Sequence, residues 1–129
     1  MHPVILKQVN KTYHLDSVGV PALCDINLEI RSNRFTVISG PSGSGKTTLL
    51  NVIGCIDRPD GGEVIVAGQD VQKMSDNALS DFRARQLGFI FQNFNLLQVL
   101  TAYENVEYPL LLTQMPDAQR KQRVLALLD

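Results

Sequence analysis

The sequence predicts an α/β fold in which an antiparallel β layer comes first, a strand, a loop and a helix follow, and further helices come last. Apolar and polar residues alternate along parts of residues 4–30, as in a sheet with one face toward a core and one toward water. Residues 35–39 are apolar and β-rich, and after a glycine-rich stretch residues 48–54 form a helical run that ends at a glycine. With 129 residues, 44% of them hydrophobic and 19% charged, the chain can form one globular core.

The β layer is predicted from two stretches of sequence. Residues 4–9 are strand-like, and along residues 25–30 an isoleucine or leucine follows each polar residue. Residues 31–34 form the turn that ends the layer, with Asn33 in a left-handed conformation. The run 35–39 is then expected to be a buried parallel strand, since such strands read as short continuous apolar segments.

A hairpin and a polar helix are expected after the first helix. The Pro-Asp-Gly-Gly sequence at 59–62 is a strong turn signal, and residues 63–68 and 70–71 have the composition of two paired strands. The helix that follows is predicted over residues 76–85, with Ser75 as its N-cap.

A second core strand is predicted at residues 87–91, where Leu-Gly-Phe-Ile-Phe is followed by Gln92. In open α/β sheets, ligands bind beyond the carboxyl ends of the strands. We therefore expect Gln92 to lie at the same edge of the sheet as the loop that follows Ser39.

Two helices are predicted near the end of the chain. Thr101 and Glu104 have the spacing of a capping box, which begins a helix that Pro109 should end or kink. Residues 115–117 begin another helix, whose apolar stripe consists of Val124, Leu125 and Leu128.

The glycine-rich stretch at residues 40–48 reads Gly-Pro-Ser-Gly-Ser-Gly-Lys-Thr-Thr, which matches G-x-x-x-x-G-K-[ST]. Its glycines permit a tight loop whose backbone N–H groups turn inward around a phosphate, at the positive end of the next helix. Lys46 can reach the β- and γ-phosphates, and the Thr47 hydroxyl can bind Mg²⁺. A flexible Gly-Ser linker is the alternative, but the predicted strand before the loop and the helix after it favour a nucleotide phosphate site.

Composition excludes several other classes of function. A net charge of −1 and an isoelectric point near 6.1 argue against a nucleic-acid partner or an anionic-membrane binder. We expect Arg120, Lys121 and Arg123 to form the solvated face of a helix. Cys24 and Cys55 lack zinc-ligand spacing and are expected to be small buried hydrophobic residues.

The sequence has no apolar run near 18 residues and no leader-like beginning. We therefore expect a cytoplasmic chain with reduced thiols that does not itself span a membrane.

Together with the β layer and Gln92, the motifs resemble those of the ATP-binding subunits of ABC transporters, closest to the lipoprotein-release and macrolide-export branch. The resemblance extends from about residue 6 to residue 129. It rests on Lys11-Thr12-Tyr13, on the loop at residues 40–48, on the turn at residues 59–62 and on residues 88–97. It implies an incomplete P-loop NTPase core with an N-terminal antiparallel β layer and the start of a helical subdomain.

The resemblance also implies roles for individual residues. Tyr13 would stack on adenine, although the sequence alone favours the alternative that it merely closes a strand end. Gln92 would reach Mg²⁺ and the attacking water, although a polar strand end is an equal alternative. Lys46 and Gln92 would be catalytic, and Thr47 and Gln92 would bind the metal. The expected binding residues for ATP and Mg²⁺ are Tyr13, Gly40, Pro41, Ser42, Gly43, Ser44, Gly45, Lys46, Thr47, Thr48 and Gln92.

By the same resemblance, two kinds of protein partner are expected. Transmembrane permease subunits would contact Phe94, Leu96, Leu97 and the helices after Thr101, and this would place the chain on the inner face of the cell membrane. A second ATP-binding subunit would complete each nucleotide site in the complete form.

The sequence departs from the family pattern in three respects. Family members continue into an LSGGQ-type signature, a hydrophobic strand ending in Asp-Glu and a switch histidine, and residues 1–129 contain none of these. Residues 125–129 imitate that strand, but leucine and alanine favour a helix there. Asn33-Arg34 stands where the family usually has Gly-Glu. We therefore expect residues 1–129 to be the N-terminal part of the domain and to be inactive as an ATPase alone.

Three rival functions share the phosphate loop. Guanylate-kinase-like enzymes have a similar loop, but it usually opens the protein, whereas here 39 residues precede it and no arginine-rich lid is found. A GTPase would carry Asn-Lys-x-Asp, and Asn10-Lys11 is followed by Thr12-Tyr13 instead. A non-catalytic module that uses the fold as an interaction scaffold stays open.

Overall fold

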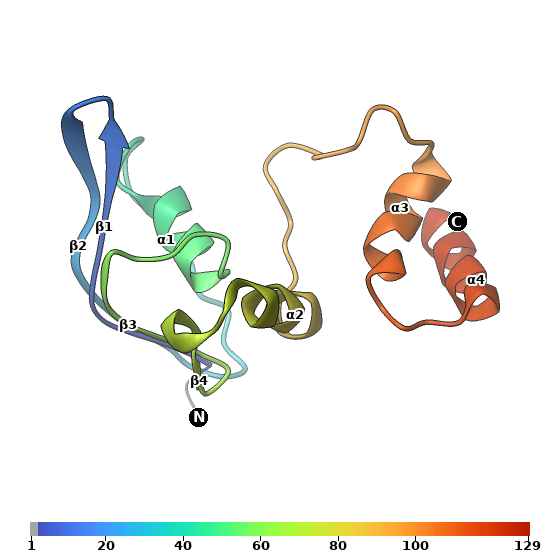
Figure 1. The fold of residues 1–129 in the computed structure, drawn as a ribbon, viewed down its shortest axis with the longest axis horizontal. Coiled ribbons are helices and arrows are strands. Elements are labelled where there is room, and N and C mark those ends of the chain that lie inside the picture. The colour runs from blue at the N-terminus through green and yellow to red at the C-terminus, as the bar shows by residue number, and fades with distance from the viewer. Residues whose placement is uncertain (1–2) are drawn as a thin grey trace. The chain divides into compact units, whose positions relative to one another are not determined.

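The computed structural model describes residues 3–129, which form two compact units divided after Gly88 (Figure 1). The first unit contains all of the described strands and two α-helices, and the second contains two further helices.

The first unit is built on a four-stranded antiparallel sheet, as predicted for its N-terminal layer. Its strands are β1 (Val4–Leu15), β2 (Val18–Ile30), β3 (Gly61–Val66) and β4 (Gln69–Asp70), in the order β2-β1-β3-β4. Figure 1 shows β1 and β2 side by side as one long hairpin. The hairpin predicted after the turn at 59–62 is β3 and β4, and a short 3₁₀ helix, η1 (Val71–Lys73), follows it.

One face of this sheet forms the core with two helices, α1 (Lys46–Ile53) and α2 (Asp76–Gln86), which lie on the same side of the sheet in Figure 1. The alternation of apolar and polar residues places the apolar side chains on this one face, because every second side chain of a strand points to the same face. Leu6 on β1 is the register partner of Leu28 on β2 and of Val64 on β3. The buried cluster consists of Val4, Leu6, Val9, Leu23, Val52, Cys55, Val64, Val66, Val71, Leu79 and Phe82.

The turn and capping signals of the first unit are confirmed, but one expectation about its cysteines is not. Asn33 has a φ of 56°, Gly54 ends α1, and the Ser75 side chain accepts a hydrogen bond from the backbone N–H of Ala78 at the start of α2. Cys55 is buried, but Cys24 is exposed, so the expectation that both cysteines are buried is wrong. Cys24 directly follows the buried Leu23 on β2, and adjacent side chains of a strand point to opposite faces, so its side chain points away from the core.

The two predicted parallel strands are not formed. Residues 34–40 and 87–91 have no regular secondary structure, and Phe35 is 95% exposed, Val37 71% and Ile90 103%. A parallel strand needs neighbours from distant parts of a chain. Among the described strands, all four belong to the antiparallel sheet and none pairs with either segment.

The second unit consists of α3 (Ala102–Leu111) and α4 (Asp117–Leu128). The capping box is confirmed, since the Glu104 N–H donates to the Thr101 side chain at 3.2 Å and the Thr101 N–H donates to the Glu104 carboxylate at 2.7 Å. Pro109 lies inside α3, and the helix ends two residues later at Leu111.

Contacts between α3 and α4 correct two predictions. The Arg120 side chain is largely buried and donates to Glu107 on α3 at 2.9 Å, so it is not part of a solvated face. Of the predicted apolar stripe on α4, Val124 is fully buried, whereas Leu125 and Leu128 are about half exposed. Residues 125–128 are helical, which confirms that this segment is not a strand.

Candidate functional site

The phosphate loop is held in a conformation that only glycine accommodates easily. Gly43 and Gly45 have φ angles of 77° and 83°, in the left-handed region. At Gly45, a side-chain Cβ would lie 2.4 Å from the carbonyl oxygen of Ala22 on β2. The close packing of the loop on the sheet therefore depends on a glycine at this position.

The loop leads directly into the N-terminus of α1. The helix begins at Lys46, and Gly45 in the N-cap position supplies no side-chain acceptor for the first N–H groups. These groups carry the positive end of the helix dipole and can donate to an anion. The arrangement fits the phosphate tail of a nucleotide.

Lys46 lies over the loop. Its ammonium donates to the carbonyl oxygens of Gly40 at 2.8 Å and Pro41 at 2.6 Å, and to the Ser44 hydroxyl at 3.2 Å. The Ser44 N–H also donates to the Pro41 carbonyl oxygen at 3.2 Å. The positive charge is therefore positioned at the loop where the motif requires it, and it stabilises the turn.

One pocket of about 230 Å³ brings Tyr13 together with the predicted phosphate residues from Gly43 to Thr48, whereas Gly40, Pro41 and Ser42 are not part of its lining. Tyr13 lines it from β1, and the cross-strand partner of Tyr13, Val20, lines it from β2. The remaining lining residues are Pro21, Ala22, Gly43, Ser44, Gly45, Lys46, Thr47 and Thr48. A hollow with an aromatic ring and a phosphate loop has the two elements that a nucleotide requires.

The Tyr13 side chain is held by a group of charged residues. Its hydroxyl donates to Asp57 Oδ2 at 2.7 Å, and Lys11 Nζ lies 3.0 Å from Asp57 Oδ1. The same ammonium lies 5.3 Å from the centre of the Tyr13 ring, within the range of a cation–π contact. It also lies 3.6 Å from the carboxylate of Asp60.

These contacts shift the acidity of all three groups. Burial tends to raise the pKa of Asp57, but hydrogen bonds from Tyr13 and Lys11 outweigh it and hold that pKa below its ordinary value. Burial tends to lower the pKa of Lys11, but the carboxylate of Asp57 raises it overall. The hydrogen bond to Asp57 and burial raise the pKa of Tyr13, while the Thr48 hydroxyl acts in the opposite direction.

The sequence did not identify Asp57, and it identified Lys11 only as part of a motif. Asp57 follows α1 closely in the chain, and its neighbours Pro59 and Asp60 indicate a turn. Nothing in that pattern says that the turn lies against β1, because the contact joins residues 44 positions apart.

Metal binding can be tested against the donors present. Among residues 3–129, no three His, Cys, Asp or Glu side chains gather as metal ligands. Mg²⁺ typically takes few protein ligands and completes its shell with phosphate oxygens and water. The Thr47 hydroxyl lines the pocket next to Lys46 and can be one of these few protein ligands.

Gln92 belongs to the second unit, just after Phe91, whose ring stacks on Phe89 at 5.6 Å. Its predicted contact with metal and water stays a prediction. Phe94 and Leu96 in the same unit are 93% and 62% exposed, and Leu97 is about half exposed. A mostly apolar hollow of about 470 Å³ is lined by Leu96, Leu97, Gln98, Leu100, Ala102, Asn105, Val106 and Leu128.

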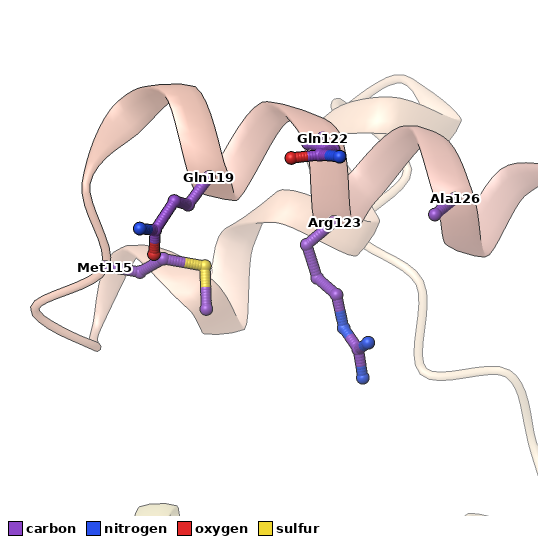
Figure 2. A pocket seen from close by; sticks show the side chains of 5 residues that line it. All are labelled: Met115, Gln119, Gln122, Arg123 and Ala126. Carbon is purple, nitrogen blue, oxygen red and sulfur yellow. The ribbon is translucent and has the colours of Figure 1, made fainter.

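Another hollow, of about 330 Å³, lies along α4 and the residues before it (Figure 2). Met115, Gln119, Gln122, Arg123 and Ala126 line it. Figure 2 shows the Arg123 side chain extending away from the helix, so the polar groups do not converge on one point. This hollow has no arrangement of groups for catalysis.

The helices of residues 3–129 lack the combination of length and apolar character that crossing a membrane requires.

Comparison with known proteins gives consistent results. The family profile described as ABC transporter matches residues 23–129. An uncharacterized ABC transporter ATP-binding protein of Thermotoga maritima is 45% identical over 96% of this chain and 53% of its own length. The macrolide export ATP-binding/permease protein MacB of Brucella abortus is 43% identical over 96% of this chain and 19% of its own length.

Solved structures agree with these relatives. The ATP-binding cassette MJ0796 of Methanocaldococcus jannaschii, a dimer in a post-hydrolysis state bound to ADP and Pi, has a TM-score of 0.86 and 44% identity. The match covers 95% of this chain and 54% of that one. This chain thus spans about half the length of the ATP-binding proteins it matches.

Proposed function

This chain belongs to the ABC transporter family, and from that premise we propose that it is the N-terminal part of an ATP-binding domain whose complete form couples ATP hydrolysis to transport. The observation that carries the proposal is the shared pocket of Tyr13 and the phosphate loop. Residues 1–129 hold the elements for binding the base and the phosphates.

Within the pocket we assign the phosphates to the N–H groups of the loop and of the first turn of α1, with Lys46 at the outer phosphates. Tyr13 stacks on the base. Mg²⁺ would neutralise phosphate charge, and the Thr47 hydroxyl is the group in this pocket that would hold it. A role for Gln92 in metal binding is expected from the family resemblance alone. The chain's own part is to orient the phosphates and to exclude some of the water around them.

Hydrolysis requires a carboxylate that orients the attacking water, because phosphoryl transfer depends on positioning and charge stabilisation. In the family that the chain resembles, this carboxylate comes from a hydrophobic strand ending in Asp-Glu, and residues 1–129 contain no such motif. We propose that this chain binds ATP·Mg²⁺ but does not turn it over alone.

The assembled transporter would add two kinds of contact. A dimer with a second ATP-binding subunit is supported by the dimeric MJ0796 structure, and a permease partner is supported by the macrolide export protein that joins both functions in its name. The exposed residues Phe94, Leu96 and Leu97 are the surface that we assign to a permease on the cytoplasmic side of the membrane.

Calorimetric titration of the chain with ATP and Mg²⁺ tests the proposal. Lys46→Ala should weaken binding by about tenfold or more, because a charge-assisted contact contributes about 1.5–3 kcal/mol. Lys121→Ala is the matched control, since Lys121 is an exposed lysine of the second unit. Absence of ATP binding, equal binding by both variants, or ATP hydrolysis that Lys46→Ala abolishes would each contradict a part of the proposal, and phosphate transfer to GMP would favour a kinase.

A further inference from the structure

We propose that Asp57, held in place by Lys11, is a positioning residue that fixes the Tyr13 ring as the platform for the nucleotide base. The inference rests on the proposed function, because it assumes that the pocket binds a nucleotide. It concerns how the chain distinguishes a nucleotide from a bare polyphosphate.

The Tyr13 ring needs support. It lies on the part of β1 near the turn between β1 and β2, and it is 38% exposed. An exposed aromatic side chain at such a position can leave its bound orientation, and ordering it on binding reduces affinity. A ring that is already oriented avoids this loss.

Asp57 supplies the fixed point at the tip of the ring. Its Oδ2 accepts the Tyr13 hydroxyl at 2.7 Å, and its Oδ1 accepts the backbone N–H of Arg58 at 2.8 Å and lies 3.0 Å from Lys11 Nζ. Both oxygens are therefore held. A carboxylate fixed in this way makes a stronger acceptor for the hydroxyl than a freely rotating one.

Lys11 contacts both the segment that contains Asp57 and the Tyr13 ring. Its side chain is only 13% exposed, and its ammonium also donates to the Arg58 carbonyl oxygen at 2.8 Å. The ammonium attracts the Tyr13 ring as well, at 5.3 Å from the ring centre. Tyr13 lines the pocket and Lys11 does not, which leaves ring surface available for a base.

The support also ties the base platform to the phosphate loop. Thr48 lines the same pocket as Tyr13 and belongs to the first turn of α1, directly after the loop. Asp57 follows the other end of the same helix. The hydrogen bond from Tyr13 to Asp57 thus links the ring to the segment that follows α1, the helix that begins at the phosphate loop.

The test compares two probes, ATP and inorganic triphosphate, each titrated with Mg²⁺ into the chain. Asp57→Ala should weaken ATP binding by about fivefold to tenfold, as expected for a lost charge-assisted hydrogen bond. Binding of inorganic triphosphate, which has no base, should change by less than about twofold. The matched control is Glu63→Ala, which removes a carboxylate that pairs with another lysine of β1, Lys7, at 2.7 Å.

A double-mutant cycle separates positioning from general stability. Tyr13→Phe keeps the ring but removes the hydroxyl, so Asp57→Ala should cause no further loss of ATP affinity in that background. Losses that add, or an Asp57→Ala variant that weakens ATP and triphosphate equally or neither, would overturn the inference. If Asp57→Ala unfolds by circular dichroism, Tyr13→Phe alone must reproduce the selective loss of ATP binding.

The outcomes distinguish this inference from the proposed function. A chain that binds neither probe refutes the proposed function and the inference with it. A chain that binds triphosphate as tightly as ATP refutes the inference but leaves the phosphate site intact.

Discussion

The antiparallel sheet and the two segments 34–40 and 87–91 were all predicted to contain strands, but only the sheet contains them. The strands alternate apolar with polar residues and the two segments are continuous apolar runs, yet only β1, β2 and β3 form a ladder with a buried face, and the two segments have no regular structure. Val64 on β3 is 0% exposed, and Val37 in the first segment is 71% exposed. The difference teaches that an apolar run becomes a strand only where a pairing partner is available.

The strands of the sheet pair with strands that lie near them in the sequence. β1 and β2 are joined by a short turn, so their pairing requires little loop closure, and β3 joins β1 after a single helix. Parallel strands depend on crossover connections and on neighbours from distant sequence. No strand described in residues 3–129 pairs with either segment.

The largest expected contrast is in amide hydrogen exchange. Core strands open with a free energy close to the global value, about 5 kcal/mol for a marginal domain, whereas unpaired segments open at almost no cost. Amides of Leu6 and Val64 should therefore exchange about a thousandfold or more slowly than those of Phe35 and Val37. Mass spectrometry or NMR would measure this, and equal protection would mean that the segments are paired in solution.

A matched pair of valine-to-alanine substitutions gives the next largest effect. Val64→Ala removes buried methyl groups and should lower the free energy of unfolding by about 2 kcal/mol, through lost burial and the cavity left behind. Val37→Ala makes the same chemical change at an exposed position and should stay within about 0.5 kcal/mol. Urea denaturation of both variants would show whether the contrast in burial holds in solution.

A pair of glycine substitutions tests the contact between the sheet and the loop. Gly43→Ala meets open space, so it should cost only the left-handed conformation, about 1–2 kcal/mol. Gly45→Ala incurs the same cost and also brings a Cβ within 2.4 Å of the Ala22 carbonyl oxygen, so it should lower stability further. Thermal unfolding would compare the two, and equal losses would indicate that the loop moves away from β2 freely.

The smallest expected effect is a pH dependence of folding stability that arises from Asp57, which pairs with Lys11 on β1. The pKa of Asp57 is lowered in the folded chain, so its contribution to stability is present above its unfolded pKa and is lost as the pH falls through the folded value. Stability should therefore decrease below about pH 4, with a share from Asp57 of less than about 1 kcal/mol. In the Asp57→Asn variant, the urea midpoint should depend less on pH in that range than it does in the unmodified chain. If the two chains show the same pH dependence, the pair of Asp57 with Lys11 is not formed.

Patterns that act over a few residues were predicted correctly. The capping box at Thr101 and Glu104, the N-cap at Ser75 and the left-handed Asn33 all depend on groups that are neighbours in the chain. The conformation of the loop at residues 40–48 is of the same kind, because its glycines, its lysine and its helix are contiguous, while phosphate binding there stays a prediction. The errors occurred where a distant partner decides, as for Arg120, which pairs with Glu107 on another helix.

The sequence by itself determined the phosphate loop, the antiparallel alternation and the family, because each is written in residues that are contiguous or regularly spaced. Only the tertiary structure decided that Tyr13 shares a pocket with the loop, that Asp57 and Lys11 hold its ring, and that residues 34–40 and 87–91 stay unpaired. These features depend on which distant segments come into contact, and burial and strand pairing are properties of the whole packed chain rather than of any local pattern.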